Sequence, residues 1–161
     1  MLAIHNILHP TDFSERSDHA FKLACALARD HGALLTIAHV LAPPVVVPVD
    51  GVVPVIPEDL EDQARARLLQ VVPTDPKVRV ERKLVLGDAS HEIIALANQL
   101  RCDLIVLGTH GRTGLGRLLM GSVAETVLRK AECPVLTVKL PFPEVERAEE
   151  PVQAAVRPAT A

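Results

Sequence analysis

Short apolar runs alternate with longer amphipathic segments along most of this chain. Apolar runs of four to eight residues, bounded by turn residues, predict strands that are buried on both faces. Strands are expected at five places: Leu2 to Leu8, Leu34 to Leu41, Val78 to Leu86, Asp103 to Leu107 and Pro134 to Val138. In the third of these, charged residues interrupt the apolar pattern, which favours a more exposed strand of the kind found at a sheet edge.

The segments between these runs repeat their apolar residues at helical spacing. The first helix is expected to begin at a cap formed by Ser14 or Asp12 and to end at Gly32. Asp88 is the expected cap of a later helix. Beyond the first, the predicted helices span three segments: Glu58 to Val72, Ser90 to Leu100 and Leu118 to Ala131.

Strands that alternate with helices predict right-handed βαβ units and therefore an α/β fold. The predicted architecture is a doubly wound, five-stranded parallel sheet with helices on both faces. The order 3-2-1-4-5 fits such a sheet, although periodicity does not determine it. In folds of this kind, ligands bind at the carboxyl ends of the strands where the winding reverses. On this order, Pro10 to Asp12 and Gly108 to Gly116 share one crevice.

The chain length of 161 residues indicates one domain, which we place at residues 1–140. Residues 141–161 are rich in proline and glutamate, which is typical of a flexible tail. Five prolines between Ala42 and Pro57 exclude a central strand and predict a long extended loop.

Composition narrows the classes of partner. The chain is 48% hydrophobic, but aromatic residues make up only 2%, so few rings are available to stack nucleic-acid bases. A net charge of −3 gives no general attraction to DNA or to anionic membranes.

No run approaches the roughly 20 apolar residues of a membrane helix, and no signal peptide is recognisable at the start. Three widely spaced cysteines favour reduced thiols and a cytoplasmic location.

The segment from Gly108 to Ser122 carries the strongest candidate chemistry. It contains five of the chain's eight glycines and follows a predicted buried strand. Glycine lets a backbone approach a ligand closely, and exposed N–H groups near a helix N-terminus bind anions. From Leu104 to Ala124 there is no acidic residue, whereas Arg112 and Arg117 are present. This bias favours a phosphate site, the alternative being a merely flexible connection.

Two well-known phosphate motifs do not match this segment. A P-loop requires a lysine before the Ser or Thr, and here Gly121 is followed directly by Ser122. The dinucleotide fingerprint GxGxxG is also absent, because the glycines follow the order GxxGxxGxG. P-loop NTPase and dinucleotide chemistry are therefore disfavoured.

The spacing resembles instead the ATP-binding branch of the universal stress protein family, which carries G-x2-G-x9-G-[ST]. This pattern is met by Gly108, Gly111 and Gly121-Ser122. Three further segments are similar to the family: ILHPTDFS near the amino terminus, His39-Val40 at a strand end, and CPVLTVK near residue 139. The resemblance covers roughly residues 2–140.

The resemblance implies an ATP site and a role for each matching residue. Asp12 would contact the adenosine, Pro10 and Thr11 would line its pocket, and the backbone of Val40 would meet the adenine. Mg²⁺ or Mn²⁺ would be held by the phosphates. The remaining implied residues surround ribose and phosphates: Gly108, Thr109, His110, Gly111, Arg112, Thr113, Gly114, Gly121, Ser122, Val123 and Ala124.

Other interpretations stay open. Asp12 could serve only as a helix cap. A Ser122–His110–Asp12 hydrolase is conceivable, but no GxSxG elbow supports it. An ATPase in the same pocket lacks an evident general base, so we expect a binding and regulatory protein rather than an enzyme, with at most slow hydrolysis. A dimerisation module that binds no nucleotide is a further alternative. A homodimer is expected through Pro134 to Val138, because an apolar edge strand is usually paired or covered.

Overall fold

The computed structural model describes residues 3–42, 59–109 and 120–139, and all structural statements below concern these residues. Five strands and four helices alternate along them, as predicted. In chain order the elements are β1 (Asn6–Pro10), α1 (Glu15–His31), β2 (Leu34–Leu41), α2 (Leu60–Gln70), β3 (Arg79–Leu86), α3 (Ala89–Gln99), β4 (Leu104–Gly108), α4 (Ser122–Lys130) and β5 (Val135–Val138).

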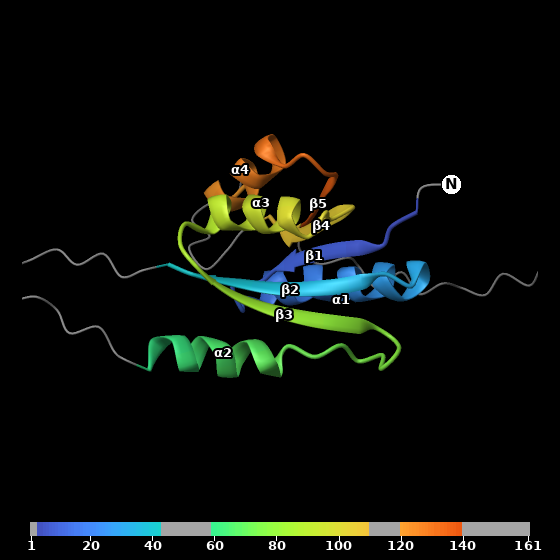
Figure 1. Ribbon diagram of the computed structural model, residues 1–161, viewed down its shortest axis with the longest axis horizontal. Coiled ribbons are helices and arrows are strands. Elements are labelled where there is room, and N and C mark those ends of the chain that lie inside the picture. The colour runs from blue at the N-terminus through green and yellow to red at the C-terminus, as the bar shows by residue number, and fades with distance from the viewer. Residues whose placement is uncertain (1–2, 43–58, 110–119, 140–161) are drawn as a thin grey trace, which may run out of the picture.

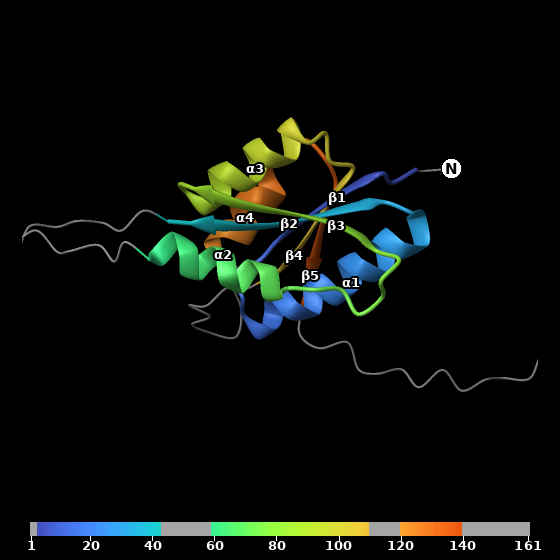
Figure 2. The same cartoon turned by 60° about the horizontal axis from the view of Figure 1, so that its bottom comes forward.

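The strands form one parallel sheet in the order β3-β2-β1-β4-β5, which confirms the predicted order. Figures 1 and 2 show α1 and α2 on one face of the sheet and α3 and α4 on the other. Since β1 connects through α1 to β2 on one side, and β4 lies on its other side, the winding reverses between β1 and β4.

Each face of the sheet has its own apolar core, because successive side chains of a strand point to opposite faces. Ile7, Ile37 and Val106 pack under α1 and α2. Leu8 and Ile105, one residue along, pack under α3 and α4. All five side chains are fully buried. The central strands are therefore covered on both faces, as their uninterrupted apolar sequences predicted.

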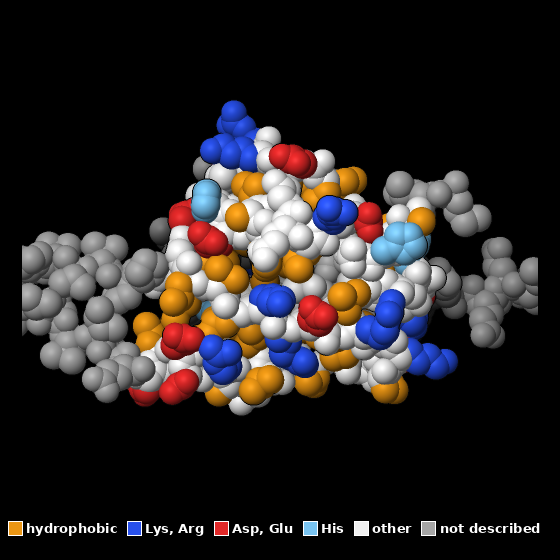
Figure 3. Space-filling view, viewed as in Figure 1, with side chains coloured by type: hydrophobic (Ala, Val, Ile, Leu, Met, Phe, Trp, Pro, Cys, Tyr) orange, Lys and Arg blue, Asp and Glu red, His pale blue; other side chains and the backbone are white. Residues whose placement is uncertain are grey.

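The exposed edge predicted for the third strand is confirmed for β3, whose residues are intermediate or exposed. Its arginines reach the ends of two helices. Arg82 donates from Nε and Nη2 to the carbonyls of Leu68 and Val71, and Arg79 donates to Gly32 O. Figure 3 shows side chains of both charges mixed over α2 and β3, with hydrophobic side chains between them.

Two elements begin well after their predicted starts, whereas the other predicted boundaries differ from the structure by two residues or fewer. The first strand, expected from Leu2 to Leu8, runs from Asn6 through Pro10, because the proline is the strand's last residue and pairs in register with Ala38. The last helix, expected from Leu118, begins at Ser122. Met120 and Gly121 are not helical, and residues 118 and 119 lie outside the described residues. Gly121 is the N-cap and has an extended backbone, which stops the helix from extending further back.

The predicted loop from Ala42 to Pro57 falls almost wholly outside the described residues, as does the tail at 141–161. The division into a domain at 1–140 and a tail therefore stays a prediction. Within the described residues, no helix combines the length and the apolar character that crossing a bilayer requires.

Candidate functional site

A cavity of about 250 Å³ opens at the carboxyl ends of the central strands. It lies beside the point between β1 and β4 where the winding reverses, the place where α/β sheets of this kind bind ligands. The lining residues come from these strand ends and from α1, α3 and α4: Pro10, Thr11, Asp12, Ser17, His39, Val40, Ala89, Ile93, Leu107, Gly108, Gly121, Ser122, Val123 and Ala124.

Nine of the residues named from the sequence line this cavity: Pro10, Thr11, Asp12, Val40, Gly108, Gly121, Ser122, Val123 and Ala124. Thr109 is buried directly beside it and accepts a hydrogen bond from Gly121 N at 2.7 Å. The five others, His110, Gly111, Arg112, Thr113 and Gly114, lie outside the described residues. The predicted shared crevice thus brings together residues from positions as far apart as 10 and 124.

The turn after β1 is held by Thr11, which uses every polar group it has. Its N–H donates to Ala38 O at 2.8 Å, and its carbonyl accepts a bond from His39 Nδ1 at 2.7 Å. Because a carbonyl only accepts, the His39 ring carries a proton on Nδ1. The Thr11 hydroxyl oxygen accepts bonds from the Phe13 N–H and the Ser17 hydroxyl. The backbone that precedes and follows the Asp12 side chain is therefore fixed to β2 and α1.

The carboxylate of Asp12 is only half satisfied. Its Oδ1 accepts both the Ser14 N–H at 3.1 Å and the Ser14 hydroxyl at 2.6 Å. Its Oδ2 is buried and has no hydrogen-bond partner among the described residues. A buried acceptor without a partner costs about 1–3 kcal/mol, and more when it is charged. An oxygen of this kind in a cavity wall suits a donor supplied by a ligand.

The helix-cap interpretation of Asp12 is corrected in part. The residue that caps α1 is Ser14, whose side chain accepts from Ser17 N. Asp12 does not cap the helix directly; its Oδ1 accepts a hydrogen bond from the hydroxyl of the capping residue, Ser14. This leaves Oδ2 without a role in the cap, since both bonds go to Oδ1.

Gly108 and the start of α4 form the opposite wall. A Cβ at Gly108 would lie 3.1 Å from Arg16 O, so glycine lets the end of β4 approach the backbone of α1 closely. The N-cap of α4, Gly121, has no side chain to bond the first N–H groups of the helix, and no side-chain cap bond is present. The first turn of α4 borders the cavity, and uncapped N–H groups at the positive end of a helix dipole suit an anion.

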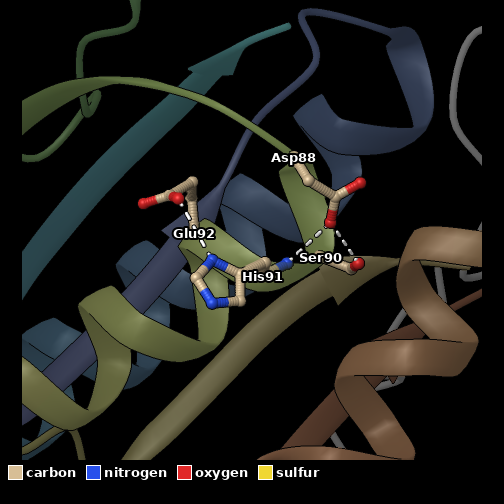
Figure 4. Close-up of polar contacts among 4 residues, drawn as sticks. All are labelled: Asp88, Ser90, His91 and Glu92. Carbon is tan, nitrogen blue, oxygen red and sulfur yellow. Dashed lines mark hydrogen bonds and ion pairs between the residues drawn. The ribbon is translucent and has the colours of Figure 1, made fainter.

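The N-terminus of α3 completes the wall through Ala89 and Ile93. Figure 4 shows how it is capped: Asp88 Oδ1 accepts the His91 N–H at 2.9 Å and the Ser90 hydroxyl at 2.6 Å. These bonds, led by that of Ser90, lower the pKa of Asp88 below its usual value. The predicted Asp88 cap is therefore confirmed. It holds the first turn of α3, and with it Ala89, at the cavity.

Behind the cavity lies a fully buried histidine, His9. Burial lowers its pKa from 6.5 to about 4, against the raising effects of its bond to Val106 and of the Asp12 charge. Its Nε2 lies 3.5 Å from the Ser17 hydroxyl, which lines the cavity. The ring is therefore neutral at pH 7, and it supports the cavity from behind rather than lining it.

Sequence reasoning missed five lining residues: Ser17, His39, Ala89, Ile93 and Leu107. In the sequence, His39 stands out only as part of a family-like strand end. The hydrophobic pattern could assign Ile93 and Leu107 to the core, but not to the part of the core that borders a cavity. Such assignments depend on the distance between elements, which periodicity does not contain.

The described residues bear on three further questions: the state of the cysteines, metal binding and the conceivable hydrolase triad. All three cysteines, Cys25, Cys102 and Cys133, are free thiols, and burial raises the pKa of each. No group of three or more His, Cys, Asp or Glu residues within the described ranges is arranged to hold a metal ion. Asp12 and Ser122 of the conceivable hydrolase triad line the same cavity, but His110 lies outside the described residues.

The fold is that of a doubly wound α/β protein, with a cavity at the sheet's topological switch. The model of the universal stress protein family matches residues 3–139. A universal stress protein of Methanocaldococcus jannaschii is 37% identical over 142 residues, which cover 86% of this chain and 84% of the relative. The chain belongs to the universal stress protein family, as the sequence resemblance indicated.

Solved structures agree with this assignment. Universal stress protein UspA from Lactobacillus plantarum superposes with a TM-score of 0.68 at 27% identity, covering 86% of this chain and 99% of that one. A universal stress protein from Archaeoglobus fulgidus, solved in complex with dAMP, gives a TM-score of 0.62 at 25% identity, with coverages of 86% and 100%. The predicted fold class is thereby confirmed.

Proposed function

We propose that this chain binds an adenine nucleotide, ATP with Mg²⁺, in the cavity beside Asp12, and that occupancy of the cavity regulates its interactions in a stress response. The observation that carries this proposal is the Asp12 Oδ2 atom, a buried acceptor without a partner among the described residues. A ribose hydroxyl is a donor of suitable size for it. The family relative solved with dAMP supports an adenine nucleotide as the ligand class.

The cavity offers different chemistry along its two sides. Pro10, Val40, Ile93 and Leu107 give an apolar surface on which a base and a sugar can pack. The first turn of α4, from Ser122 onward, offers N–H groups without side-chain caps for phosphate oxygens, whereas the Gly121 N–H already donates to Thr109 O. A nucleotide placed between them would have its base toward Val40, its ribose near Asp12 and its phosphates toward α4. By the family resemblance, the glycine-rich residues 108–114 would then contact the ribose and the phosphates.

The divalent ion of this proposal belongs to the nucleotide. Mg²⁺ is usually held by phosphate oxygens, water and one or two carboxylates. Among the described residues that line the cavity, Asp12 is the carboxylate present. We therefore expect the ion to arrive with the phosphates and not to bind the protein strongly without them.

We propose a binding role and not a fast enzymatic one. Of the titratable groups that line the described cavity, Asp12 already binds Ser14 through Oδ1, and His39 Nδ1 is committed to Thr11 O. In the proposed orientation the base lies toward Val40 and the ribose hydroxyl takes Asp12 Oδ2, so neither His39 nor Asp12 is placed at the phosphates as a general base for a water molecule. We expect ATP turnover far below the ordinary enzyme range of about 1 s⁻¹ or more. A kcat in that range that is lost in Asp12→Ala would support the ATPase alternative.

Isothermal titration calorimetry with ATP in excess Mg²⁺ tests the proposal. The expected result is one saturable site per chain, with weaker heat from GTP under the same conditions. Absence of any saturable heat at millimolar ATP would contradict the proposal. That result would favour the alternative of a dimeric interaction module that works without nucleotide.

The same proposal includes a homodimer formed through β5 and a cytoplasmic location. β5 is at the end of the sheet order, and Leu136 on it is 37% exposed. Leu128, on the neighbouring α4, is 46% exposed. An apolar sheet edge of this kind is usually paired or covered. Sedimentation at tens of micromolar should give a dimer, and Leu136→Lys should shift it toward monomer; a wild-type monomer would contradict this part.

A further inference from the structure

Phe13, in the turn that follows Asp12, adopts a left-handed backbone conformation with φ of 61°. A bulky residue rarely occupies this region, because its Cβ approaches the following carbonyl. Its N–H donates to the Thr11 hydroxyl oxygen at 3.1 Å. The conformation persists only if the surroundings hold it in place. The contacts of the Phe13 ring therefore matter for the shape of this turn.

The Phe13 ring contacts two residues from elements outside its own turn. The His39 ring, on β2, lies 4.3 Å away between centroids, and the guanidinium carbon of Arg67, on α2, lies 4.4 Å from the Phe13 centroid. His39 lines the cavity that contains Asp12. Arg67 does not line that cavity; it lines a second hollow of about 620 Å³ between α1 and α2. Phe13 itself lines the second hollow, and its ring contacts His39 in the wall of the first.

The contacts of the Phe13 ring affect the backbone on both sides of Asp12. His39 binds the carbonyl of Thr11, and Thr11 and Phe13 are the chain neighbours of Asp12 on either side. If the Phe13 ring loses its contact with Arg67, the strained backbone can relax toward ordinary φ values. The Asp12 carboxylate would then leave its position in the cavity wall. Restoring that position would cost binding free energy.

We propose that Arg67 is a positioning residue for the nucleotide cavity, which it does not touch, and that it acts by holding Phe13 and thereby the turn that carries Asp12. This inference rests on the proposed nucleotide site, and it adds a residue of α2 that affects the affinity of that site for nucleotide. By the same contacts, a ligand in the hollow between α1 and α2 that displaces Arg67 from Phe13 would weaken nucleotide binding. Because coupling between two sites is reciprocal, bound nucleotide would weaken the binding of that ligand by the same factor.

The test compares Arg67→Met with Arg65→Met in the full chain. Arg65 is on the same helix, is exposed, pairs with Glu61 and does not line the second hollow, so it controls for the loss of charge and of a surface arginine. We expect Arg67→Met to weaken ATP binding about fivefold, the factor that corresponds to about 1 kcal/mol for an exposed cation–π contact. Arg65→Met should bind like the wild type, and Arg67→Lys should recover most of the affinity.

A double variant tests the route through Phe13. In a Phe13→Leu background, which removes the aromatic ring, Arg67→Met should have no further effect on ATP affinity. Equal affinity of Arg67→Met and wild type would overturn the inference, as would an equal loss in Arg65→Met. A loss from Arg67→Met that persists undiminished in the Phe13→Leu background would also overturn it.

The ligand-free protein separates this inference from the proposed function. In amide NMR spectra without nucleotide, Arg67→Met should shift the signals of Thr11, Asp12 and His39, whereas Arg65→Met should leave them unchanged. If the wild type binds no ATP, the proposed function fails, but these shifts would still support the positioning role of Arg67. Unchanged signals in Arg67→Met would overturn that role whether or not ATP binds.

Discussion

The Nδ1 atom of His9 lies 2.9 Å from the carbonyl oxygen of Val106, so a side chain of β1 bonds the backbone of β4 inside the core. The register between these strands ends at Leu8 and Ile105, and the next residue of β1 that would donate is Pro10, which has no N–H. The imidazole supplies a donor where the backbone cannot. Nδ1 therefore carries the proton, since a carbonyl only accepts.

This relationship predicts a pH dependence of stability. The folded pKa of His9, about 4, lies below its usual 6.5, so between these values the unfolded chain binds more protons than the folded one. The stabilisation is complete above pH 6.5 and is lost as pH falls toward 4. The full difference corresponds to roughly 3 kcal/mol. Urea unfolding at several pH values should show this loss.

A variant pair isolates the contribution of His9. His9→Asn keeps a donor near the position of Nδ1 but does not titrate, so its free energy of unfolding should fall less steeply between pH 6.5 and 4. His31→Asn, at an exposed position near the end of α1, should retain the wild-type slope. Equal slopes in all three proteins would show that His9 is not held neutral.

Gly108 and Gly32 predict opposite patterns in a comparison of alanine variants. A Cβ at Gly108 would press on the Arg16 carbonyl, so Gly108→Ala should move the start of α1 away from β4 and weaken ATP binding. Gly32 has φ of 64°, and a Cβ there would meet no atom within 4 Å. Gly32→Ala should therefore cost about 1 kcal/mol of stability and leave ATP binding intact. Urea unfolding and calorimetry on both variants check this, and equal losses of ATP affinity would contradict it.

Asp103 fastens the start of β1 to β4. Its Oδ2 accepts the N–H groups of His5 at 2.7 Å and Asn6 at 2.9 Å, and these bonds, led by that of His5, lower its pKa below 3.8. The stabilisation is therefore present above pH 3.8 and is lost as pH falls through the lower folded value.

Asp103→Ala should consequently lower the melting temperature at pH 7, with a smaller difference from the wild type near the acid limit of the folded state. Asp30→Ala removes an exposed carboxylate that pairs with Arg29, and it should change the melting temperature little at either pH. A constant difference between Asp103→Ala and wild type across this range would argue against a role of the ionised carboxylate.

The sequence predicted the parts of the fold that depend on local pattern. The apolar runs located every strand, and the Ser14, Gly32 and Asp88 signals marked helix ends that the structure confirms. The start of α4 was misplaced because Leu118 and its neighbours are apolar at helical spacing, whereas Gly121, with its extended backbone, sets the boundary.

The candidate site was predictable where a residue follows a central strand. Pro10, Thr11, Asp12 and Gly108 fall at strand ends that a doubly wound sheet brings together. Ser17 and Ile93 could not be found in this way, because each is on a helix whose distance from the sheet depends on packing. The contact of Arg67 with Phe13 joins residues 54 positions apart and has no signature in the local sequence.

The central claim, that the cavity beside Asp12 is the nucleotide site, is tested most directly by calorimetric titration of Asp12→Asn with ATP and Mg²⁺. Asparagine can keep an acceptor oxygen for Ser14 while it replaces the unpartnered Oδ2 by a donor group. Asp75→Asn is the matched control, because Asp75 also accepts an N–H two residues on, from Lys77, but does not line the cavity. We predict affinity about tenfold or more below wild type for Asp12→Asn, the effect of losing a hydrogen bond to a charged group, and wild-type affinity for Asp75→Asn. ATP affinity that is unchanged in Asp12→Asn would contradict the account.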